Sequence, residues 1–357
     1  MLKKVLALTG VAVLTVSALA TAQTPNVDER IRIVSRTVLE QQPRPRPRVL
    51  VQGRDGREEQ SETIQKTVRL GNNGELDVSN IAGNIEIKRG GGNDAVIDVV
   101  KVSRGRTVED AKEMLGLVKV DINERGNRVE VRTQYPSDLH IFNNRRNINV
   151  QVHYTITAPS NTRITARSIS GNIRAAEITG ELSLVSTSGD IQVVKGKRVS
   201  AAKSTSGNVE ISDMDSDMPL EAASVSGDII VHRAKAARME LSTVSGKVIA
   251  QDVTSDRLEA QSLSGDVEFT GPFSKGGRYE FNSHSGNVKV AVAGNTGFEI
   301  EANSWSGNVE SQVAMSGGVQ TSPGRGPRRK ELKGVVGDGS AIVEVTTFSG
   351  NVLITKR

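Results

Sequence analysis

The chain has 357 residues, with 46 lysines and arginines against 41 acidic residues, and it contains no cysteine. The lack of cysteine excludes disulfides and a bacterial lipid anchor, and a formal charge of +5 is too small to indicate a nucleic-acid partner. Aromatic residues make up only 3% of the chain while there are 35 glycines, so we expect no bulky globular core. Stability must then come from burial spread along an extended fold.

Residues 1–22 have the pattern of a secretory signal peptide. Two lysines precede an apolar run from Val5 to Ala20, and small residues up to Ala22 form a cleavage site. No later segment approaches the roughly 20 apolar residues that a membrane-spanning helix needs. We therefore expect an exported protein, periplasmic or at the cell surface, with no membrane span after the signal is removed.

Residues 23–62 are polar and include the sequence Pro-Arg-Pro-Arg-Pro-Arg at positions 43–48. Alternating proline favours a stiff, extended backbone, so this segment is predicted to be a disordered linker or spacer.

From residue 63 apolar and polar residues alternate, which predicts half-buried strands. One helix is expected at about 107–115, because Thr107 can cap its start and Gly116 can end it. Residues 63–163 are therefore predicted to form a β-rich amino-terminal cap with one short helix.

Residues 164–357 repeat the pattern Ser-x-Ser-Gly-Asn/Asp-Ile/Val at steps of 18 to 21 residues, followed by one step of 43. The repeat glycines are Gly171, Gly189, Gly207, Gly227, Gly246, Gly265, Gly286, Gly307 and Gly350, and Gly83 carries a degenerate copy. A fixed step with a constant turn signature is typical of stacked coils. The predicted fold is all-β, a parallel β-solenoid (β-helix-like) of about nine or ten coils, in which the long step is one coil with an inserted basic loop at 316–339.

Alternation along a strand separates inward from outward positions in each coil. By this parity the serines one and three residues before the glycine both face inward, where their hydroxyls need hydrogen-bond partners. The glycine is expected to provide the backbone angle of the turn. This interpretation makes the repeat a structural element and disfavours an outer serine array.

Six residues before the glycine, an outward position carries a column of glutamates: Glu221, Glu240, Glu259, Glu280, Glu301 and Glu344. Such a column can attract cations, but Arg238, Arg257 and Arg278 stand two residues earlier in three coils. A solvated network of ion pairs is the favoured interpretation, with cation binding left open.

Two residues before the glycine, a further outward position forms what we call the outer strip: Ile169, Thr187, Thr205, Val225, Val244, Leu263, His284, Trp305 and Phe348. Its carboxy-terminal members are apolar or aromatic and can stack on sugar rings or dock a protein. The alternative is that the loop around Arg325, or the amino-terminal strands, covers it. The candidate binding residues are Trp305, His284, Phe348 and Leu263, with the basic residues Arg325, Arg328, Arg329 and Lys330 beside them.

Catalytic and metal-binding patterns are weak in this sequence. The four histidines are scattered, and no cysteine can act as a nucleophile. Asp190, Asp228 and Asp266 recur on alternate coils, about 9.6 Å apart on the usual strand spacing, too far to share one ion unaided. We predict no catalytic residue, metal site or cofactor.

The repeat, the strand Tyr154-Thr-Ile-Thr-Ala-Pro159 and the last coil ending Ser349-Gly-Asn-Val352 resemble the bacterial adhesin-like family of secreted β-strand-repeat proteins, domain of unknown function 4097. The resemblance covers nearly the whole chain after the linker. It implies a repeat β-fold and an adhesin-like role, and it supplies no catalytic residues. Lys247 departs from the pattern, which has Asn or Asp at that position.

Together these features predict a non-catalytic protein of the cell envelope that binds a polymer, such as a glycan, or a protein partner along its outer faces. A β-helix polysaccharide lyase or hydrolase is the first alternative, and it would need Glu280, Glu301 and Arg278 to line a groove. A structural or envelope-stress protein without a ligand is the second.

Overall fold

The computed structural model describes residues 57–71, 73–136, 149–321 and 330–357. Within these residues the fold is all-β with a single helix, which confirms the predicted class. The predicted signal peptide and the Pro-Arg segment lie outside the described residues.

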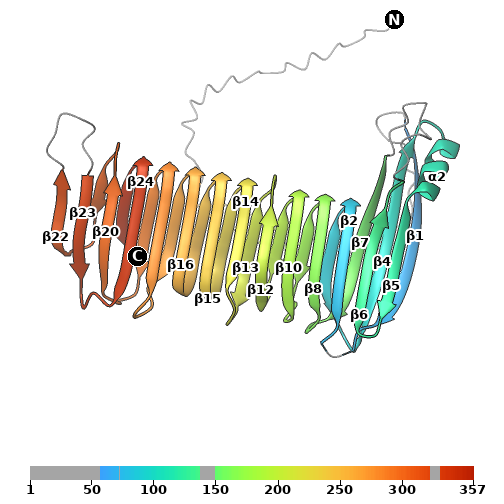
Figure 1. The fold of residues 1–357 in the computed structure, drawn as a ribbon, viewed down its shortest axis with the longest axis horizontal. Coiled ribbons are helices and arrows are strands. Elements are labelled where there is room, and N and C mark those ends of the chain that lie inside the picture. The colour runs from blue at the N-terminus through green and yellow to red at the C-terminus, as the bar shows by residue number, and fades with distance from the viewer. Residues whose placement is uncertain (1–56, 72, 137–148, 322–329) are drawn as a thin grey trace, which may run out of the picture. The chain divides into compact units, whose positions relative to one another are not determined.

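The strands that precede the repeat glycines lie side by side in one row, called here the front row (Figure 1). Neighbours within this part of the row are parallel. In spatial order it contains β8 (Arg163–Ser170), β10 (Glu181–Ser188), β12 (Arg198–Ser204), β14 (Leu220–Ser226), the second halves of β15 (Ile229–Ser245) and β16 (Val248–Ser264), β18 (Arg278–Ser285), β24 (Ala341–Ser349) and β20 (Phe298–Ser304).

The strands that follow the glycines form a second row of parallel neighbours, called the back row. In spatial order it contains β9 (Ile173–Ala176), β11 (Ile191–Val194), β13 (Val209–Asp215), the first halves of β15 and β16, β17 (Val267–Pro272), β19 (Val288–Ala293), β25 (Val352–Lys356) and β21 (Val309–Ser311). Each repeat thus adds one strand to each row.

The amino-terminal strands continue both rows. β2 (Glu75–Ala82) and β3 (Ile85–Gly90), which flank Gly83, pair in parallel with β8 and β9, so the degenerate copy belongs to the repeat stack. The next strands outward are β6 (Arg128–Gln134) and β7 (Val150–Pro159), also parallel.

Antiparallel strands complete this end of the fold. β5 (Lys119–Arg125) pairs with β6, β4 (Asp94–Gly105) pairs with β7, and β1 (Glu58–Arg69) pairs with β4. β1 therefore begins inside the segment predicted as a linker.

The helix α2 (Val108–Leu117) starts where the capping pattern predicts, with the Asp110 amide donating to Thr107 Oγ1 at 3.1 Å. It does not end at Gly116, because that glycine lies within its last turn. The buried Lys101 ammonium takes the place of a glycine cap: it donates to the backbone oxygens of Leu115 and Val118 at 3.1 and 3.2 Å. Its charge is balanced by Glu62 at 2.5 Å.

The carboxy-terminal end differs from the prediction. Residues 316–339 are not a loop throughout, because β22 (Ser316–Thr321) and β23 (Lys330–Val336) pair antiparallel, and β23 extends the front row beside β20. The last coil, β24 and β25, does not follow β20 and β21 in space but inserts between them and the coil of β18 and β19 (Figure 1). The last strand, β25, is therefore an interior strand of the back row, with β19 on one side and β21 on the other.

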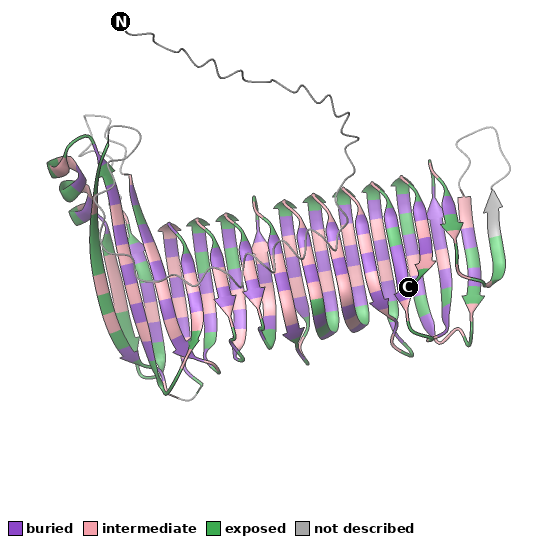
Figure 2. Cartoon of the chain, turned by 180° about the vertical axis from the view of Figure 1, so that it is seen from behind, coloured by how far each residue is buried: buried purple, intermediate pink, exposed green. Residues whose placement is uncertain are grey.

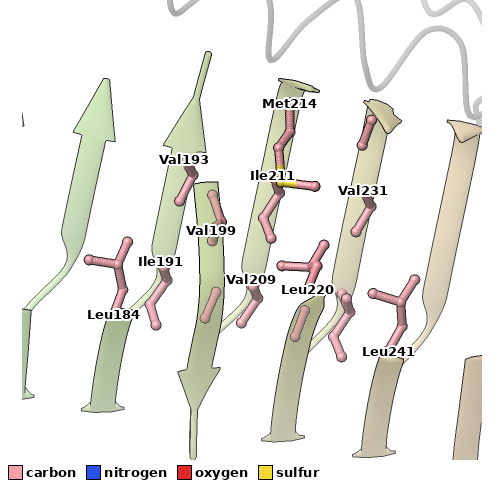
Figure 3. Packing of buried hydrophobic residues seen from close by; sticks show 14 of the residues in the cluster. Leu184, Ile191, Val193, Val199, Val209, Ile211, Met214, Leu220, Val231 and Leu241 are labelled. Carbon is pink, nitrogen blue, oxygen red and sulfur yellow. The ribbon is translucent and has the colours of Figure 1, made fainter. Parts of the chain in front are cut away.

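The core lies between the two rows, and buried residues alternate with partly exposed ones along nearly every strand (Figure 2). Leu184 of the front row lies beside Ile191 of the back row, and Leu220 lies beside Val209 (Figure 3). Because the side chains are small and aliphatic, stability accumulates coil by coil, at about 1.5–3 kcal/mol for each fully buried Val, Leu or Ile.

The repeat glycines are required for close approach and not for an unusual turn angle. A Cβ on Gly246 would lie 2.2 Å from the Gly227 carbonyl oxygen, and one on Gly207 would lie 2.3 Å from that of Gly189. Among the glycines of residues 164–357 that carry the motif, only Gly171 has a positive φ, at 154°. The corner is narrow because glycine stacks on glycine from coil to coil.

The two serine columns beside these glycines face opposite ways. The hydroxyls three residues before the glycine are buried, and from Ser186 onward they donate to the glycine carbonyl of the neighbouring coil, as Ser204 does to Gly189 at 2.9 Å and Ser262 to Gly246 at 2.8 Å. The serines one residue before the glycine, such as Ser264, are exposed, so the prediction that both columns face inward is wrong for this one. The backbone turns the corner between the two positions, which breaks the alternation on which the prediction rested.

The Asn or Asp after each glycine links the coils on the other side of the corner. Its side chain accepts from the next coil's backbone, as when the Asn208 amide donates to Asp190 Oδ1 at 2.8 Å. Lys247 has no acceptor to offer; its ammonium instead pairs with Asp266 Oδ2 at 3.0 Å. The series of hydrogen bonds from backbone amides to Asn or Asp side chains is therefore missing one member, at Lys247.

At the opposite corner, five successive coils place a non-glycine residue in the left-handed region, with φ between 48° and 59°. These residues are Glu177, Lys195, Asp213, Arg233 and Asp252. Their charges alternate, and neighbours form ion pairs, including Lys195 with Glu177 at 3.3 Å and Arg233 with Asp213 at 2.5 Å. Salt links between coils thus accompany a strained backbone position.

Candidate binding surface

The exposed large hydrophobic side chains of the described residues all lie on the outer face of the front row. They are Ile169, Val185, Val225, Val244, Leu263, Trp305, Val335, Ile342 and Phe348, and each is between 37% and 53% exposed. Six of them belong to the outer strip. Because contiguous exposed apolar patches are typical of interaction sites, this face is the candidate binding surface.

A groove of about 550 Å³ runs along the carboxy-terminal half of this face. Val244, Leu263, His284, Phe348 and Trp305 line it from the outer strip. Two sets of polar side chains complete the lining. The outward residues two positions before the strip residues are Ser242, Gln261, Asn282 and Thr346. The buried hydroxyls three positions before the repeat glycines are those of Ser224, Thr243, Ser262 and Ser283. The structure therefore brings the four predicted residues Trp305, His284, Phe348 and Leu263 into one groove.

The order of the rings differs from their order in the sequence. Because the last coil is inserted, Phe348 lies between His284 and Trp305. Its ring is parallel to that of His284, with centroids 5.0 Å apart and 7° between the planes, and it is tilted by 32° from that of Trp305 at 6.4 Å. The sequence steps placed Trp305 next to His284 and missed this arrangement.

The stacking decides which part of the rings a ligand can reach. Parallel rings with centroids 5.0 Å apart cover each other's faces, since coplanar neighbours would stand farther apart. Phe348, with a ring on either side, turns mainly its edge outward. The groove thus offers ring edges and aliphatic side chains above a floor of hydroxyls and amides.

Beside the groove, the glutamate column is continuous, and Glu344 stands between Glu280 and Glu301. Arg278 pairs with Glu344 at 2.8 Å, and Asn282 donates to Glu280 at 2.7 Å. These contacts agree with the predicted ion-pair network. In the part of the chain that the structure describes, no group of three or more His, Cys, Asp or Glu residues could hold a metal ion.

The basic residues predicted beside the strip are only partly placed. Arg325, Arg328 and Arg329 lie outside the described residues. Lys330 begins β23 beside Ser304, and its ammonium bonds to Asn308 Oδ1. At the end of this row, hydrogen bonding to Glu331 and the nearby charge of Glu301 raise the pKa of Lys333.

The predicted alternative that the amino-terminal strands cover the outer strip is not what the structure shows. β1, β4 and β5 stand at the other end of the rows, and the strip's large apolar members stay exposed. No helix among the described residues has the length and apolar character needed to cross a membrane.

Two rows of parallel strands joined at a Ser-x-Ser-Gly corner, with apolar side chains exposed on one outer face, define a repeat β-protein with a candidate binding surface. The family model described as Toastrack DUF4097 matches residues 73–355, and the chain belongs to this family. No curated protein matches the chain.

Three solved structures match most of the chain at low identity, each with a TM-score below 0.5. A putative cell adhesion protein from Clostridium sporogenes ATCC 15579 is 11% identical, with a TM-score of 0.28, over 84% of this chain and 100% of the other. A putative adhesin from Bacteroides fragilis NCTC 9343 is 14% identical, with a TM-score of 0.36, over 83% and 97%. A putative lipid binding protein from Parabacteroides distasonis ATCC 8503 is 11% identical, with a TM-score of 0.41, over 83% and 96%.

Proposed function

We propose that this chain is a non-catalytic, adhesin-like protein exported to the periplasm or cell surface, which docks a partner on the outer strip. One observation carries the proposal: every exposed large hydrophobic side chain of the described residues lies on the outer face of the front row, and five members of the strip line one groove. The signal-peptide pattern of residues 1–22 supports export.

The architecture suits this role. We interpret the two rows as a parallel β-solenoid of nine or ten coils, supported by the continuous parallel pairing from β2 and β3 to β20 and β21. A rigid row of coils presents the same outward position again and again, so a binding surface can extend over many repeats without moving parts.

A protein partner fits the groove better than a glycan. Sugars bind aromatic residues by lying on the open face of a ring, and the stacking of His284 on Phe348 covers the facing sides of these two rings. Ring edges and aliphatic side chains instead favour close packing with apolar side chains of a partner, while the amides of Gln261 and Asn282 can bond to its backbone.

A polysaccharide lyase or hydrolase is less well supported. The catalytic alternative requires Glu280, Glu301 and Arg278 in a groove, but the lining provided by the described residues contains no carboxylate and no arginine. Arg278 is paired with Glu344 on the neighbouring outward column.

Photo-cross-linking in the producing bacterium tests the proposal. A benzophenone amino acid replaces Leu263 in the groove or, as a matched control, the exposed Lys289 on the back row. We expect a discrete protein adduct at position 263 and none at 289. Equal labelling at the two positions, or no adduct at 263, would overturn a protein-docking role. Glycan-array binding that Trp305→Ala abolishes would instead favour a glycan ligand.

A further inference from the structure

We propose that the outer strip docks a proline-rich, basic segment of its partner, which lies along the groove as a polyproline II helix. This inference rests on the proposed function of the strip as a docking surface for a protein, and it adds the chemical class of the segment that binds.

The first argument is the spacing of the groove. Residues of the outer strip that lie two coils apart, such as Val244 and His284 or His284 and Trp305, stand about 9.6 Å apart on the usual strand spacing. A polyproline II helix rises about 3.1 Å per residue and repeats every three residues, or about 9.3 Å. Every third residue of such a helix can therefore meet the strip in the same way at every second coil.

Other backbone conformations match this spacing less well. The groove is lined from the coil of Ser224 to that of Trp305, which is five coil steps or about 24 Å. Over this length a polyproline II helix falls out of step with the coils by about 1 Å, whereas an α-helix, with a pitch of about 5.4 Å, falls out of step by about 3 Å. Side chains on one face of an extended strand stand about 6.7 Å apart, which matches neither one coil step nor two.

The second argument is the hydrogen bonding that the groove offers. Proline has no N–H, and a polyproline II helix leaves its carbonyl groups without internal partners, so a proline-rich segment needs donors and hardly any acceptors. Ser242, Gln261 and Thr346 belong to the polar lining, and in the described part of the chain their side chains donate to no other group. The groove thus offers a line of available donors beside its apolar side chains.

The row of rings suits proline side chains. Proline-rich segments dock in aromatic-lined grooves, where their compact rings fit between larger ones. His284, Phe348 and Trp305 form such a row, with centroids 5.0 and 6.4 Å apart. Because proline fixes its own φ, the segment is already extended before it binds, and docking costs it little conformational entropy.

The third argument is charge. The six coils that line the groove carry seven outward glutamates and three outward arginines: Glu221, Glu240, Glu259, Glu280, Glu299, Glu301 and Glu344, with Arg238, Arg257 and Arg278. Four of the glutamates already pair with Lys203, Arg238, Arg278 or Lys333, at 2.5 to 3.7 Å. Among the described residues, Glu259, Glu280 and Glu299 form no ion pair, and Arg257 is the one arginine of this set without an acidic partner. The face beside the groove therefore keeps an excess of negative charge after its own ion pairs are formed.

This excess favours a basic segment, because opposite charges across an interface attract. The glutamates stand about 13 Å from the strip, on the far side of the polar lining. With a three-residue period, a segment can place proline on the strip at every turn and an arginine at every turn on the side of Glu259 and Glu280.

Three fluorescently labelled peptides test the proposal by the change in their fluorescence anisotropy on binding the purified chain. The first has three Pro-Pro-Arg repeats and is about 28 Å long as a polyproline II helix. The second, with Pro-Pro-Glu repeats, keeps the backbone and reverses the charge. The third, with Gly-Ser-Arg repeats, keeps the charge and loses the preformed helix. Leu263→Ala removes an apolar side chain from the groove, and Ile342→Ala is the matched control, because Ile342 is 46% exposed against 51% for Leu263 and lies outside the groove.

We expect the Pro-Pro-Arg peptide to bind at least about tenfold more tightly than either of the other two. Leu263→Ala should weaken its binding about five- to tenfold and Ile342→Ala should not, with unchanged circular dichroism in both because both side chains are exposed. Glu259→Gln combined with Glu280→Gln should weaken binding and make it less sensitive to salt.

Equal binding of the Pro-Pro-Arg and Gly-Ser-Arg peptides would overturn the polyproline II helix, and equal binding of the Pro-Pro-Glu peptide would overturn the basic character of the segment. An equal loss in Ile342→Ala and Leu263→Ala would overturn the groove as the site. If no peptide binds while the benzophenone at position 263 still captures a protein, this inference fails and the docking function stands. Absence of that adduct overturns the docking function itself.

Discussion

The rings of His284 and Phe348 stack with centroids 5.0 Å apart although 64 residues separate them in the chain. The contact exists because the last coil enters the stack next to the coil of His284. Thr347 Oγ1 donates to the Gly286 carbonyl at 2.9 Å, and Ser304 Oγ donates to the Gly350 carbonyl at 2.8 Å. These two bonds continue through the inserted coil the hydroxyl-to-glycine pattern that Ser262 and Ser283 form in earlier coils.

Replacing a repeat glycine should destabilise the fold strongly. In Gly246→Ala the added Cβ would meet the Gly227 carbonyl oxygen at 2.2 Å, so the two coils must separate. We expect a loss of about 3 kcal/mol in the free energy of unfolding, measured by urea denaturation. Gly91→Ala is the matched control, because nothing lies within 4 Å of its added Cβ. Similar losses in the two variants would contradict the close-approach role.

The two serine columns should respond differently to alanine. Ser262→Ala leaves the Gly246 carbonyl without its donor and should cost about 1–2 kcal/mol of unfolding free energy. Ser264→Ala, two residues later in the same coil, changes an exposed side chain and should cost less than about 0.5 kcal/mol. Thermal unfolding of the two variants gives the comparison. A larger effect at Ser264 would mean that the inward column has been misidentified.

The features that the sequence predicted well depend on local alternation. The outward glutamates and the outward strip follow from a period of two within one strand. The capping of α2 by Thr107 is likewise local. These features needed no knowledge of how the coils stack.

The features that the sequence missed depend on the corners and on coil order. Alternation fails where the backbone turns, which is why Ser264 is exposed when parity placed it inside. Coil order could not be predicted, because every coil carries the same ladder: Thr347 could bond to the glycine of any neighbouring coil equally well. The lining of the groove depends on the position of Phe348 between His284 and Trp305, which the sequence pattern does not indicate.

Lys195→Gly should stabilise the protein. Lys195 has φ of 54°, a conformation that costs a residue with a Cβ about 1–2 kcal/mol and glycine almost nothing. The lost ion pair with Glu177 is exposed and contributes little, and the greater backbone entropy of glycine in the unfolded chain offsets part of the gain. We expect a net gain of about 0.5–1 kcal/mol by chemical denaturation, and none for Lys195→Ala, which keeps its Cβ. A destabilised glycine variant would contradict the assignment of strain.

His153 should make the amino-terminal end sensitive to acid. Its Nδ1 accepts from the Asn84 amide at 3.2 Å, and burial lowers its pKa below the ordinary value of 6.5. The unfolded chain therefore binds a proton first as the pH falls below 6.5, so this contribution to stability is present above that pH and is lost below it. Melting temperatures between pH 7.5 and pH 5 should fall less in His153→Gln than in the natural chain. An unchanged pH dependence in the variant would contradict this role.

The groove has the lining described only if the last coil lies between those of His284 and Trp305, and disulfide trapping tests this most directly. Asn282 is the register partner of Thr346, and Thr346 is that of Asn303. In the otherwise cysteine-free chain, Asn282→Cys with Thr346→Cys should form an intramolecular disulfide on mild oxidation, because neighbouring strands place the two residues within reach. Asn282→Cys with Asn303→Cys, two coils or about 9.6 Å apart, should not. A disulfide in the second pair and none in the first would contradict the account.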